Sequence, residues 1–334
     1  MSAATVKRAL PSFAMTLLAL TLLGGCIDID FPSPHLVQTP RILAIRVDPP
    51  EAQFGEDIVF SALVVDEDGT ELSGQPNVEM RWELCLSLRA VLSAAGLGGG
   101  GLSDNCAEGG SDLIRLETEG LAPNEGRLPG AVVLALAAAL PMAGPDMPPP
   151  DVPGLDPMLF DTLGVVISEV GVPLRIRFEV WRDGEVLMTG FKRFAITTRA
   201  MPTTNPPPPR FAVDGVWLTG RVDGGDPHVC VPEEGVPPRL APEEQVDVTP
   251  DPDEEPWIER YPVFNLGGEL TENEESAYYS WFSTAGAFGG DITRRPERDI
   301  AFTAPERPGN YPMWLVMRDG HLGLSWCRAE YEVR

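Results

Sequence analysis

Apolar and polar residues alternate along several short stretches of the chain, with the period expected of half-buried β-strands. One stretch covers residues 78–86 and another covers residues 174–181. The residues expected to face a core are Val78, Met80, Trp82, Leu84 and Leu86 in the first stretch and Leu174, Ile176, Phe178 and Val180 in the second. Cys85 falls on the opposite face of its strand, away from the core. The pattern predicts a β-protein.

Turn sequences divide the other apolar stretches into further strands. Asp66–Gly69 ends one stretch, Asp183-Gly184 predicts a hairpin, and Asp319-Gly320 predicts a turn near the C-terminus. The further strands expected from this pattern are residues 58–65, 185–197, 211–219, 278–283, 313–318 and 324–333.

Residues 87–171 interrupt the strand pattern, and we interpret them as an insertion. They contain a Gly-rich stretch at residues 97–102, an Ala- and Leu-rich helix candidate at residues 131–140 and a Pro-rich stretch at residues 142–157. A second helix is expected from Asp156, an N-cap followed by Pro157, to Val170. Ten apolar residues are too few to span a membrane, so residues 131–140 are expected to pack against a sheet.

The length of 334 residues leaves room for two domains. Pro206–Pro209 is a polyproline run, which acts as a semi-rigid spacer, so we place a linker at residues 200–210. The first domain is then residues 40–199 and the second is residues 211–334. With 34 Gly and 35 Pro in the chain, a turn-rich β-fold is favoured over a helical one.

Gly309-Asn310-Tyr311 stands immediately before the penultimate expected strand. In this respect the sequence resembles immunoglobulin-like and PKD-like domains, in which a Gly-x-Tyr motif begins that strand and the tyrosine ring closes a corner. The resemblance implies two tandem immunoglobulin-like β-sandwiches, the first carrying the helical and Pro/Gly-rich insertion. It also implies that Trp82 and Trp281 are core residues. The usual disulfide between the second and sixth strands is absent, which leaves the strand topology open.

The N-terminus has the pattern of an export signal, because Lys7 and Arg8 precede an apolar run that ends near Leu23. The run is shorter than the roughly 20 residues that span a membrane. It ends in Leu22-Leu23-Gly24-Gly25-Cys26, which resembles the lipobox of bacterial lipoproteins. The resemblance implies that residues 1–25 are a signal peptide, that Cys26 becomes the lipid-modified first residue and that residues 26–39 form a tether.

Residues after the lipobox bear on the location of the protein. In Gram-negative lipoproteins an Asp directly after the lipidated Cys is associated with retention in the inner membrane, whereas here Ile27 holds that place. The resemblance therefore implies an outer-membrane lipoprotein, facing the periplasm or the cell surface. The lipobox, residues 41–50 and Met317–Gly320 together resemble uncharacterised surface lipoproteins of the myxobacterial and deltaproteobacterial kind. That group has no established activity.

The chain carries 50 acidic and 25 basic side chains, a formal net charge of −25. A nucleic-acid partner is not expected, because phosphate binding needs a basic face. Removal of residues 1–25 takes away Lys7 and Arg8 and no acid, leaving 23 basic against 50 acidic groups and a net charge of −27. Membrane attachment would therefore rest on acyl chains, at about 0.8 kcal/mol per buried CH₂, and not on charge.

Five cysteines are present, and four remain once Cys26 is assigned to the lipid. An even number in an exported chain predicts disulfides, with three pairings available. Proximity and the domain boundary favour Cys85–Cys106 and Cys230–Cys327, for which loop closure predicts about 3 and about 4.7 kcal/mol of stabilisation. The alternative is a zinc site, although the spacing matches no recognised structural zinc pattern. Its candidate ligands are His228, Cys230, His321 and Cys327.

Residues 233–275 form the most acidic segment, with 14 acidic side chains against Arg239 and Arg260 and a net charge of −12. We expect a solvated acidic loop that keeps the protein soluble. The alternative is a calcium site, because Ca²⁺ binds carboxylate oxygens, although no EF-hand spacing is present. Its candidate ligands are Asp247, Asp251, Asp253, Glu254 and Glu255. No other cofactor is expected.

No Gly-x-Ser-x-Gly, His-Glu-x-x-His, Ser-x-x-Lys or phosphate-binding loop occurs in the sequence, which has three histidines. We therefore expect a non-enzymatic binding or structural role in the envelope, with an unidentified envelope protein or glycan as partner. The alternative is a surface hydrolase acting on glycans or peptides, since carboxylates are abundant. Trp181, Trp217 and Trp257 are candidate contact residues, each equally expected as an edge-packed ring.

Overall fold

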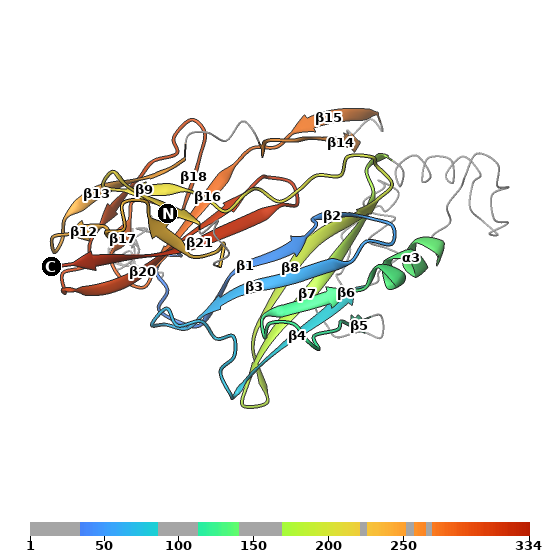
Figure 1. The fold of residues 1–334 in the computed structure, drawn as a ribbon, viewed down its shortest axis with the longest axis horizontal. Helices are drawn as coiled ribbons and strands as arrows, with labels where there is room; N and C mark the ends of the chain where they lie inside the picture. The colour runs from blue at the N-terminus through green and yellow to red at the C-terminus, as the bar shows by residue number, and fades with distance from the viewer. Residues whose placement is uncertain (1–33, 86–112, 140–168, 221–225, 252–256, 265–268) are drawn as a thin grey trace, which may run out of the picture. The chain divides into compact units, whose positions relative to one another are not determined.

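The computed structural model describes residues 34–85, 113–139, 169–220, 226–251, 257–264 and 269–334. Residues Pro34–Arg334 form one compact unit. This unit is nearly all β, as predicted. Among its described residues, the helix in the order of elements is α3 (Gly130–Ala139). The strands build two β-sandwiches, called here the first and the second sandwich (Figure 1).

The first sandwich pairs a three-stranded sheet, in the order β1-β3-β6, with a five-stranded sheet, in the order β2-β8-β7-β4-β5. The strands are β1 (Arg41–Asp48), β2 (Glu51–Gln53), β3 (Ile58–Val65), β4 (Val78–Cys85), β5 (Leu113–Arg115), β6 (Glu125–Leu128), β7 (Val172–Arg182) and β8 (Glu185–Thr197). Apolar side chains from both sheets form one core, which includes Phe60, Trp82, Phe178 and Phe194. The predicted inward faces of β4 and β7 are confirmed, because their alternate residues lie in this core.

The second sandwich pairs a six-stranded sheet, β11-β10-β9-β13-β19-β17, with a five-stranded sheet, β12-β21-β20-β16-β18. The strands of the six-stranded sheet are β9 (Phe211–Val213), β10 (Val216–Gly220), β11 (Cys230–Pro232), β13 (Gln245–Pro250), β17 (Ala287–Phe288) and β19 (Ile300–Thr303). Those of the five-stranded sheet are β12 (Arg239–Leu240), β16 (Tyr278–Ser283), β18 (Ile292–Arg294), β20 (Gly309–Arg318) and β21 (Leu324–Val333). A hairpin of β14 (Arg260–Phe264) and β15 (Leu270–Glu274) pairs separately. Trp281, Phe302 and Leu315 lie in the core between the two sheets.

A third apolar cluster joins the outer face of the β1-β3-β6 sheet to the outer face of the β20–β21 pair. We call it the seam cluster, and its buried members are Val37, Leu43, Ala44, Leu63, Val65, Trp314, Val316, Leu324 and Trp326. Strands β3 and β20 therefore bury both faces, which explains their continuous apolar stretches, Ala62–Val65 and Met313–Met317. The division into two domains at residues 200–210 stays a prediction, because one compact unit contains both sandwiches.

The predicted linker is not an exposed spacer. Thr203 is 2% exposed, and its N–H donates to Glu51 Oε2 at 2.7 Å in the first sandwich. The Asn205 side chain joins the sandwiches, since its amide donates to the Val47 carbonyl at 2.7 Å and its oxygen accepts the Leu324 N–H at 3.0 Å. Proline residues lack N–H groups, so the Thr203 N–H and the Asn205 side-chain amide are among the few donors that hold the segment in place.

The last part of the predicted tether is also packed. Val37 is 1% exposed, its N–H donates to the Ser283 carbonyl at 2.9 Å, and the Ser283 N–H donates to the His35 carbonyl at 3.0 Å. The His35 ring lies edge-on against Phe288. Residues 34–37 therefore extend the second sandwich, so the tether prediction is wrong for them, and residues 26–33 lie outside the described residues.

Three further expectations need correction. The predicted strand at residues 211–219 is a β9–β10 hairpin, because Asp214 and Gly215 have φ values of 48° and 74° and form the turn. Residues 233–275 are not one acidic loop, since β12 to β15 lie within them. Residues 87–171 are not wholly an insertion, since β5 pairs with β4 and β6 pairs with β3.

Other expectations are confirmed. The Asp183-Gly184 turn joins β7 to β8, the Asp66–Gly69 turn ends β3, and α3 occupies nearly all of the predicted residues 131–140.

One prediction is not tested, because the second predicted helix, Asp156 to Val170, lies almost wholly outside the described residues. Two further predictions are confirmed. Tyr311 closes the expected corner, because its hydroxyl donates to the Arg307 carbonyl at 2.8 Å. Trp82 and Trp281 are both fully buried.

Candidate functional site

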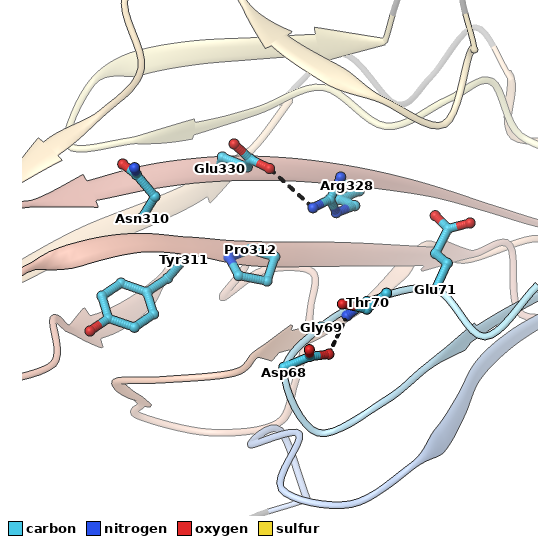
Figure 2. Close-up of a pocket in the computed structure, with 9 residues that line it drawn as sticks. All are labelled: Asp68, Gly69, Thr70, Glu71, Asn310, Tyr311, Pro312, Arg328 and Glu330. Carbon is cyan, nitrogen blue, oxygen red and sulfur yellow. Dashed lines mark hydrogen bonds and ion pairs between the residues drawn. The ribbon is translucent and has the colours of Figure 1, made fainter. Parts of the chain in front are cut away.

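An open pocket lies where the turn after β3 meets strands β20 and β21 (Figure 2). Its volume is about 430 Å³, within the range of small-ligand sites. The residues that line it are Asp68, Gly69, Thr70, Glu71, Asn310, Tyr311, Pro312, Arg328 and Glu330. The first four come from the first sandwich and the others from the second, so the pocket belongs to both sandwiches.

Gly69 allows the turn to sit directly against β20. Its φ is +81°, a conformation that favours glycine, and a Cβ at this position would lie 2.5 Å from Pro312 Cγ and 2.9 Å from Trp314 Cη2. Within the turn, the Thr70 N–H donates to Asp68 Oδ1 at 2.8 Å. This hydrogen bond holds the pKa of the Asp68 carboxyl below its usual range. Asp68 is therefore an ionised acceptor at the mouth of the pocket.

The opposite wall carries one cation and one further carboxylate. Arg328 Nη2 donates to Glu330 Oε1 at 3.0 Å, and both residues extend from β21 (Figure 2). The Tyr311 hydroxyl donates its hydrogen bond to the Arg307 carbonyl, so this tyrosine offers mainly its ring to the pocket. The lining thus combines an aromatic ring and an amide with three carboxylates and a paired guanidinium. These groups suit hydrogen bonding to a polar ligand more than nucleophilic chemistry.

A second group of chemically notable residues is a set of buried ionisable side chains beside the linker, which we call the Glu51 cluster. Glu51 is 1% exposed and its carboxylate contacts Arg199, His321 Nε2 at 3.1 Å and the Thr203 N–H. The His321 ring stacks on Tyr261 with centroids 3.7 Å apart. Burial lowers the pKa of His321 to about 4, so its imidazole is neutral at pH 7.

Three more members of the Glu51 cluster lie around the turn after β20. They are Lys192 from β8, Glu275 after β15 and Asp319 after β20. Burial lowers the pKa of Lys192 to about 8, while burial together with the charge of Asp319 raises the pKa of Glu275 to about 8. Burial also raises the pKa of Asp319. Perturbed pKa values concentrate at functional sites, which makes this cluster a second candidate.

The predicted disulfide between Cys230 and Cys327 is present, with a Cα–Cα distance of 5.5 Å. The zinc alternative is therefore wrong, because neither sulfur is a free thiolate. The two histidines of that alternative are also engaged elsewhere, since His228 stacks on Trp326 and His321 on Tyr261. Cys85 is disulfide-bonded and 4% exposed, on the face of β4 away from the core. Its expected partner, Cys106, lies outside the described residues.

The calcium candidates do not come together in the described part of the chain. Asp251 pairs with Arg210 at 3.2 Å, and Asp247 lies on β13 opposite Ala301. Asp253, Glu254 and Glu255 lie outside the described residues. Among residues that the structure describes, no group of three His, Cys, Asp or Glu side chains is placed to hold a metal ion.

The three tryptophans considered as contact residues are half-buried. Arg81 lies over the Trp181 ring at 3.9 Å, and Arg210 lies over the Trp217 ring at 4.0 Å. Trp257 packs against the core of the second sandwich. The edge-packed interpretation therefore holds for all three, and cation–π contacts cover two of them.

The proposed lipidation site, Cys26, lies outside the described residues. Within the part of the chain that the structure describes, none of the helices is long and apolar enough to cross a membrane.

The sequence matches no known protein-family profile, and no curated protein matches it. Solved structures similar to this chain include E. coli alpha-2-macroglobulin, at 10% identity and a TM-score of 0.22 over 89% of this chain. The D0-D1 domain of intimin matches 87% of the chain at 11% identity and a TM-score of 0.19, covering 98% of that domain pair. A Bacteroides ovatus protein, SGBP-B of a mixed-linkage glucan utilization locus, matches 88% at 9% identity and a TM-score of 0.20, covering 70% of its length.

The chain spans only 17% of the alpha-2-macroglobulin that it matches. At such low TM-scores, these similarities carry no argument about function.

The residues of the Glu51 cluster escaped the sequence analysis. They come from β2, from β8 and the residues directly after it, from the end of β15 and from the β20–β21 turn, and no local pattern links these segments. One signal was available, because Lys192 and Lys7 are the only lysines among 25 basic residues. Lys192 is the one lysine after the predicted signal peptide, and lysine changes its pKa on burial more readily than arginine.

Proposed function

We propose that this chain is a lipid-anchored protein of a bacterial envelope with a non-enzymatic binding role, and that it takes its ligand in the pocket between the Asp68 turn and strands β20 and β21. The observation that supports binding is the pocket itself, which is open and lined by polar side chains from both sandwiches. Ligand sites commonly combine such convergent polar groups with an aromatic surface.

The pocket favours a neutral, hydroxyl-rich or cationic ligand over an anion. Asp68, Glu71 and Glu330 face a single guanidinium, Arg328, which Glu330 already neutralises. The net charge of −25 repels anions further. An envelope glycan or a basic segment of an envelope protein fits these charges.

The anchor is supported by the sequence Leu22-Leu23-Gly24-Gly25-Cys26. Its test is incorporation of labelled palmitate into the full chain expressed in a Gram-negative host. The Cys26→Ser variant is expected to lose the label and to leave the membrane fraction. A Ser12→Ala variant, altered in the same apolar run, is expected to keep both. Equal labelling of Cys26→Ser and the unmodified chain would refute the anchor.

Binding is tested by titrating purified envelope glycans and envelope proteins against the full chain. Glu330→Gln is expected to weaken binding of any true ligand at least fivefold, because it removes a pocket carboxylate. Glu306→Gln changes an exposed carboxylate outside the pocket and is the matched control. A ligand whose affinity is the same for both variants does not use this pocket. Turnover of a glycan or peptide in the same preparation would favour the hydrolase alternative.

A further inference from the structure

Strand β8 is an open edge of the five-stranded sheet over most of its length. It has 13 residues and pairs on one side with β7, from Glu185 to Ile196. On its other side, β2 covers only Ala195–Thr197. Within the described part of the chain, no other strand pairs with residues 185–194 on that side. An unpaired edge of this kind is a template on which a further strand can form hydrogen bonds.

The backbone of β8 offers hydrogen-bonding groups to this open edge. The Ala195 N–H points to the β2 side, where it donates to the Pro50 carbonyl at 3.0 Å. The backbone groups of an antiparallel strand face its two neighbours in alternation. Thr189, Phe191 and Arg193 therefore present their N–H and C=O groups to the same side as Ala195, beyond the stretch that β2 covers.

The side chains along the open edge are apolar and exposed. Val186, Leu187 and Phe191 are 47%, 37% and 41% exposed. Natural edge strands are protected against pairing by proline or charged residues, and residues 186–191 include neither. The register irregularity between β7 and β8 lies at one end of this stretch, beside Trp181. The edge thus has the properties of a site for strand addition.

We propose that a second copy of this chain adds its own β8 to this edge, antiparallel and about a two-fold axis at Thr189, so that two five-stranded sheets become one. In this register Glu185 lies opposite the partner's Arg193. Leu187 lies opposite the partner's Phe191, and the two Thr189 residues face each other. A two-fold pairing uses the same surface of both copies, so it ends at a dimer. It uses none of the residues of the ligand pocket and goes beyond the binding role proposed above.

The segment is its own complement, which is why a second copy fits it. Opposite charges, apolar pairs that include an aromatic ring and threonine pairs all stabilise antiparallel strands when they lie opposite each other. Within one copy, Arg193 lies opposite Arg175 on β7, a pair of like charges. The partner's Glu185 places a negative charge on the other side of Arg193. With the axis at Gly190 instead, Leu187 would lie opposite the partner's Arg193, and both favourable pairs would be lost.

Disulfide cross-linking of the full chain in detergent solution tests the register. In a hydrogen-bonded antiparallel pair, opposite Cα atoms lie about 5.5 Å apart, within the range of about 4.4–6.8 Å for a disulfide. Thr189→Cys is therefore expected to link two copies under mild oxidation. Leu187→Cys is the matched control, because position 187 is exposed on the same face but its two copies would be offset by about 14 Å along the strands. We expect at least tenfold more linked dimer from Thr189→Cys, and equal linkage would overturn the proposal.

Charge reversal tests the pairing without a cross-link. Sedimentation velocity of the full chain over a range of concentrations gives the dimer dissociation constant. We expect a micromolar value, because one strand pair buries less surface than a standard interface. Arg193→Glu is expected to raise the constant at least fivefold, since two carboxylates then face each other. The double variant Glu185→Arg/Arg193→Glu should return it to within about twofold of the unmodified value. Arg307→Glu changes an exposed arginine of the second sandwich and is the control.

Two results of the sedimentation experiment would also overturn the proposal. One is a chain that stays monomeric at all concentrations, which would leave the open edge to an extended segment of another protein. The other is a dimer that Arg193→Glu does not weaken or that the double variant does not restore, which would place the contact elsewhere. The side chains at positions 185, 187, 189 and 193 are all exposed, so each variant is expected to fold as the unmodified chain does, which circular dichroism checks.

Discussion

Substitution of Gly69 by alanine tests whether the turn after β3 is pressed against the second sandwich. Two costs are expected. A residue with a Cβ is strained at φ +81°, by about 1–2 kcal/mol. The new Cβ would also lie 2.5 Å from Pro312 Cγ and 2.9 Å from both Thr284 Cγ2 and Trp314 Cη2, and such overpacking costs about 1–3 kcal/mol more.

Gly55→Ala is the matched control for the backbone term. Gly55 has φ +86°, close to that of Gly69, but nothing lies within 4 Å of the position that its Cβ would take. Its expected cost is therefore the conformational term alone, about 1–2 kcal/mol. Gly69→Ala should exceed Gly55→Ala by about 1–3 kcal/mol, which is the part due to contact with Pro312 and Trp314.

Urea denaturation followed by tryptophan fluorescence measures both variants, with the free energy of unfolding compared at a common slope. Trp314 is one of the reporters and is fully buried in the seam cluster. If the two alanine variants are equally destabilised, within about 0.5 kcal/mol, the turn is not held against β20. The account of the pocket as a site built by both sandwiches would then be wrong.

Four further outcomes follow from single contacts. The double variant Cys230→Ser/Cys327→Ser should lower the free energy of unfolding by up to about 4.7 kcal/mol, since the two cysteines of the disulfide are 97 positions apart, and urea titration against the oxidised unmodified chain checks it. Tyr311→Phe should cost about 0.5–1.5 kcal/mol in the same titration, because only the hydrogen bond to Arg307 is lost, and an unchanged midpoint would contradict the corner. Stability should fall as the pH drops from about 6.5 to about 4, by up to about 3 kcal/mol from His321, since the unfolded chain takes up the proton first, and His321→Gln should flatten this part of the curve. Trp181→Ala should cost less than Trp82→Ala, which is expected at about 3–5 kcal/mol, because Trp181 lies at the edge and Trp82 in the core, and a reversed order in thermal melts would be inconsistent with the assigned faces.

Most of the strands and turns that were predicted correctly followed from the local pattern of apolar, polar and turn residues. The faces of β4 and β7, the turn at Asp183-Gly184 and the terminal pair β20–β21 all follow from alternation and turn residues, which act within a few positions of the chain. Strand β6 could not be found in this way, because Glu125–Leu128 has few apolar residues. Its place depends on Gly126, where a Cβ would lie 2.7 Å from the Trp82 ring, and that contact is long-range.

The seam cluster was partly readable in the sequence. The four residues Ala62–Val65 and the five residues Met313–Met317 are apolar without interruption, which indicates burial on both faces of a strand. The pattern does not say which surface covers the second face. Leu63 and Trp314 share one buried cluster because two strands about 250 positions apart pack together, and no local rule predicts that packing.

The two candidate sites could not be predicted from the sequence, because each combines residues from segments that are far apart in the chain. The cysteine pairing Cys230–Cys327 was predictable because few alternatives existed. The pocket joins the Asp68 turn to Arg328, and the Glu51 cluster joins Lys192 to Asp319, so each requires the tertiary fold. Acidic residues are so common in this chain that their identity alone singles out none of them.

The seam gives the two candidate sites a physical relation. The pocket takes one wall from each sandwich, and the Glu51 cluster also joins the sandwiches, through Glu51 of the first and His321 of the second. Any shift of one sandwich against the other must therefore alter the pocket walls, with the seam cluster as the contact that resists it.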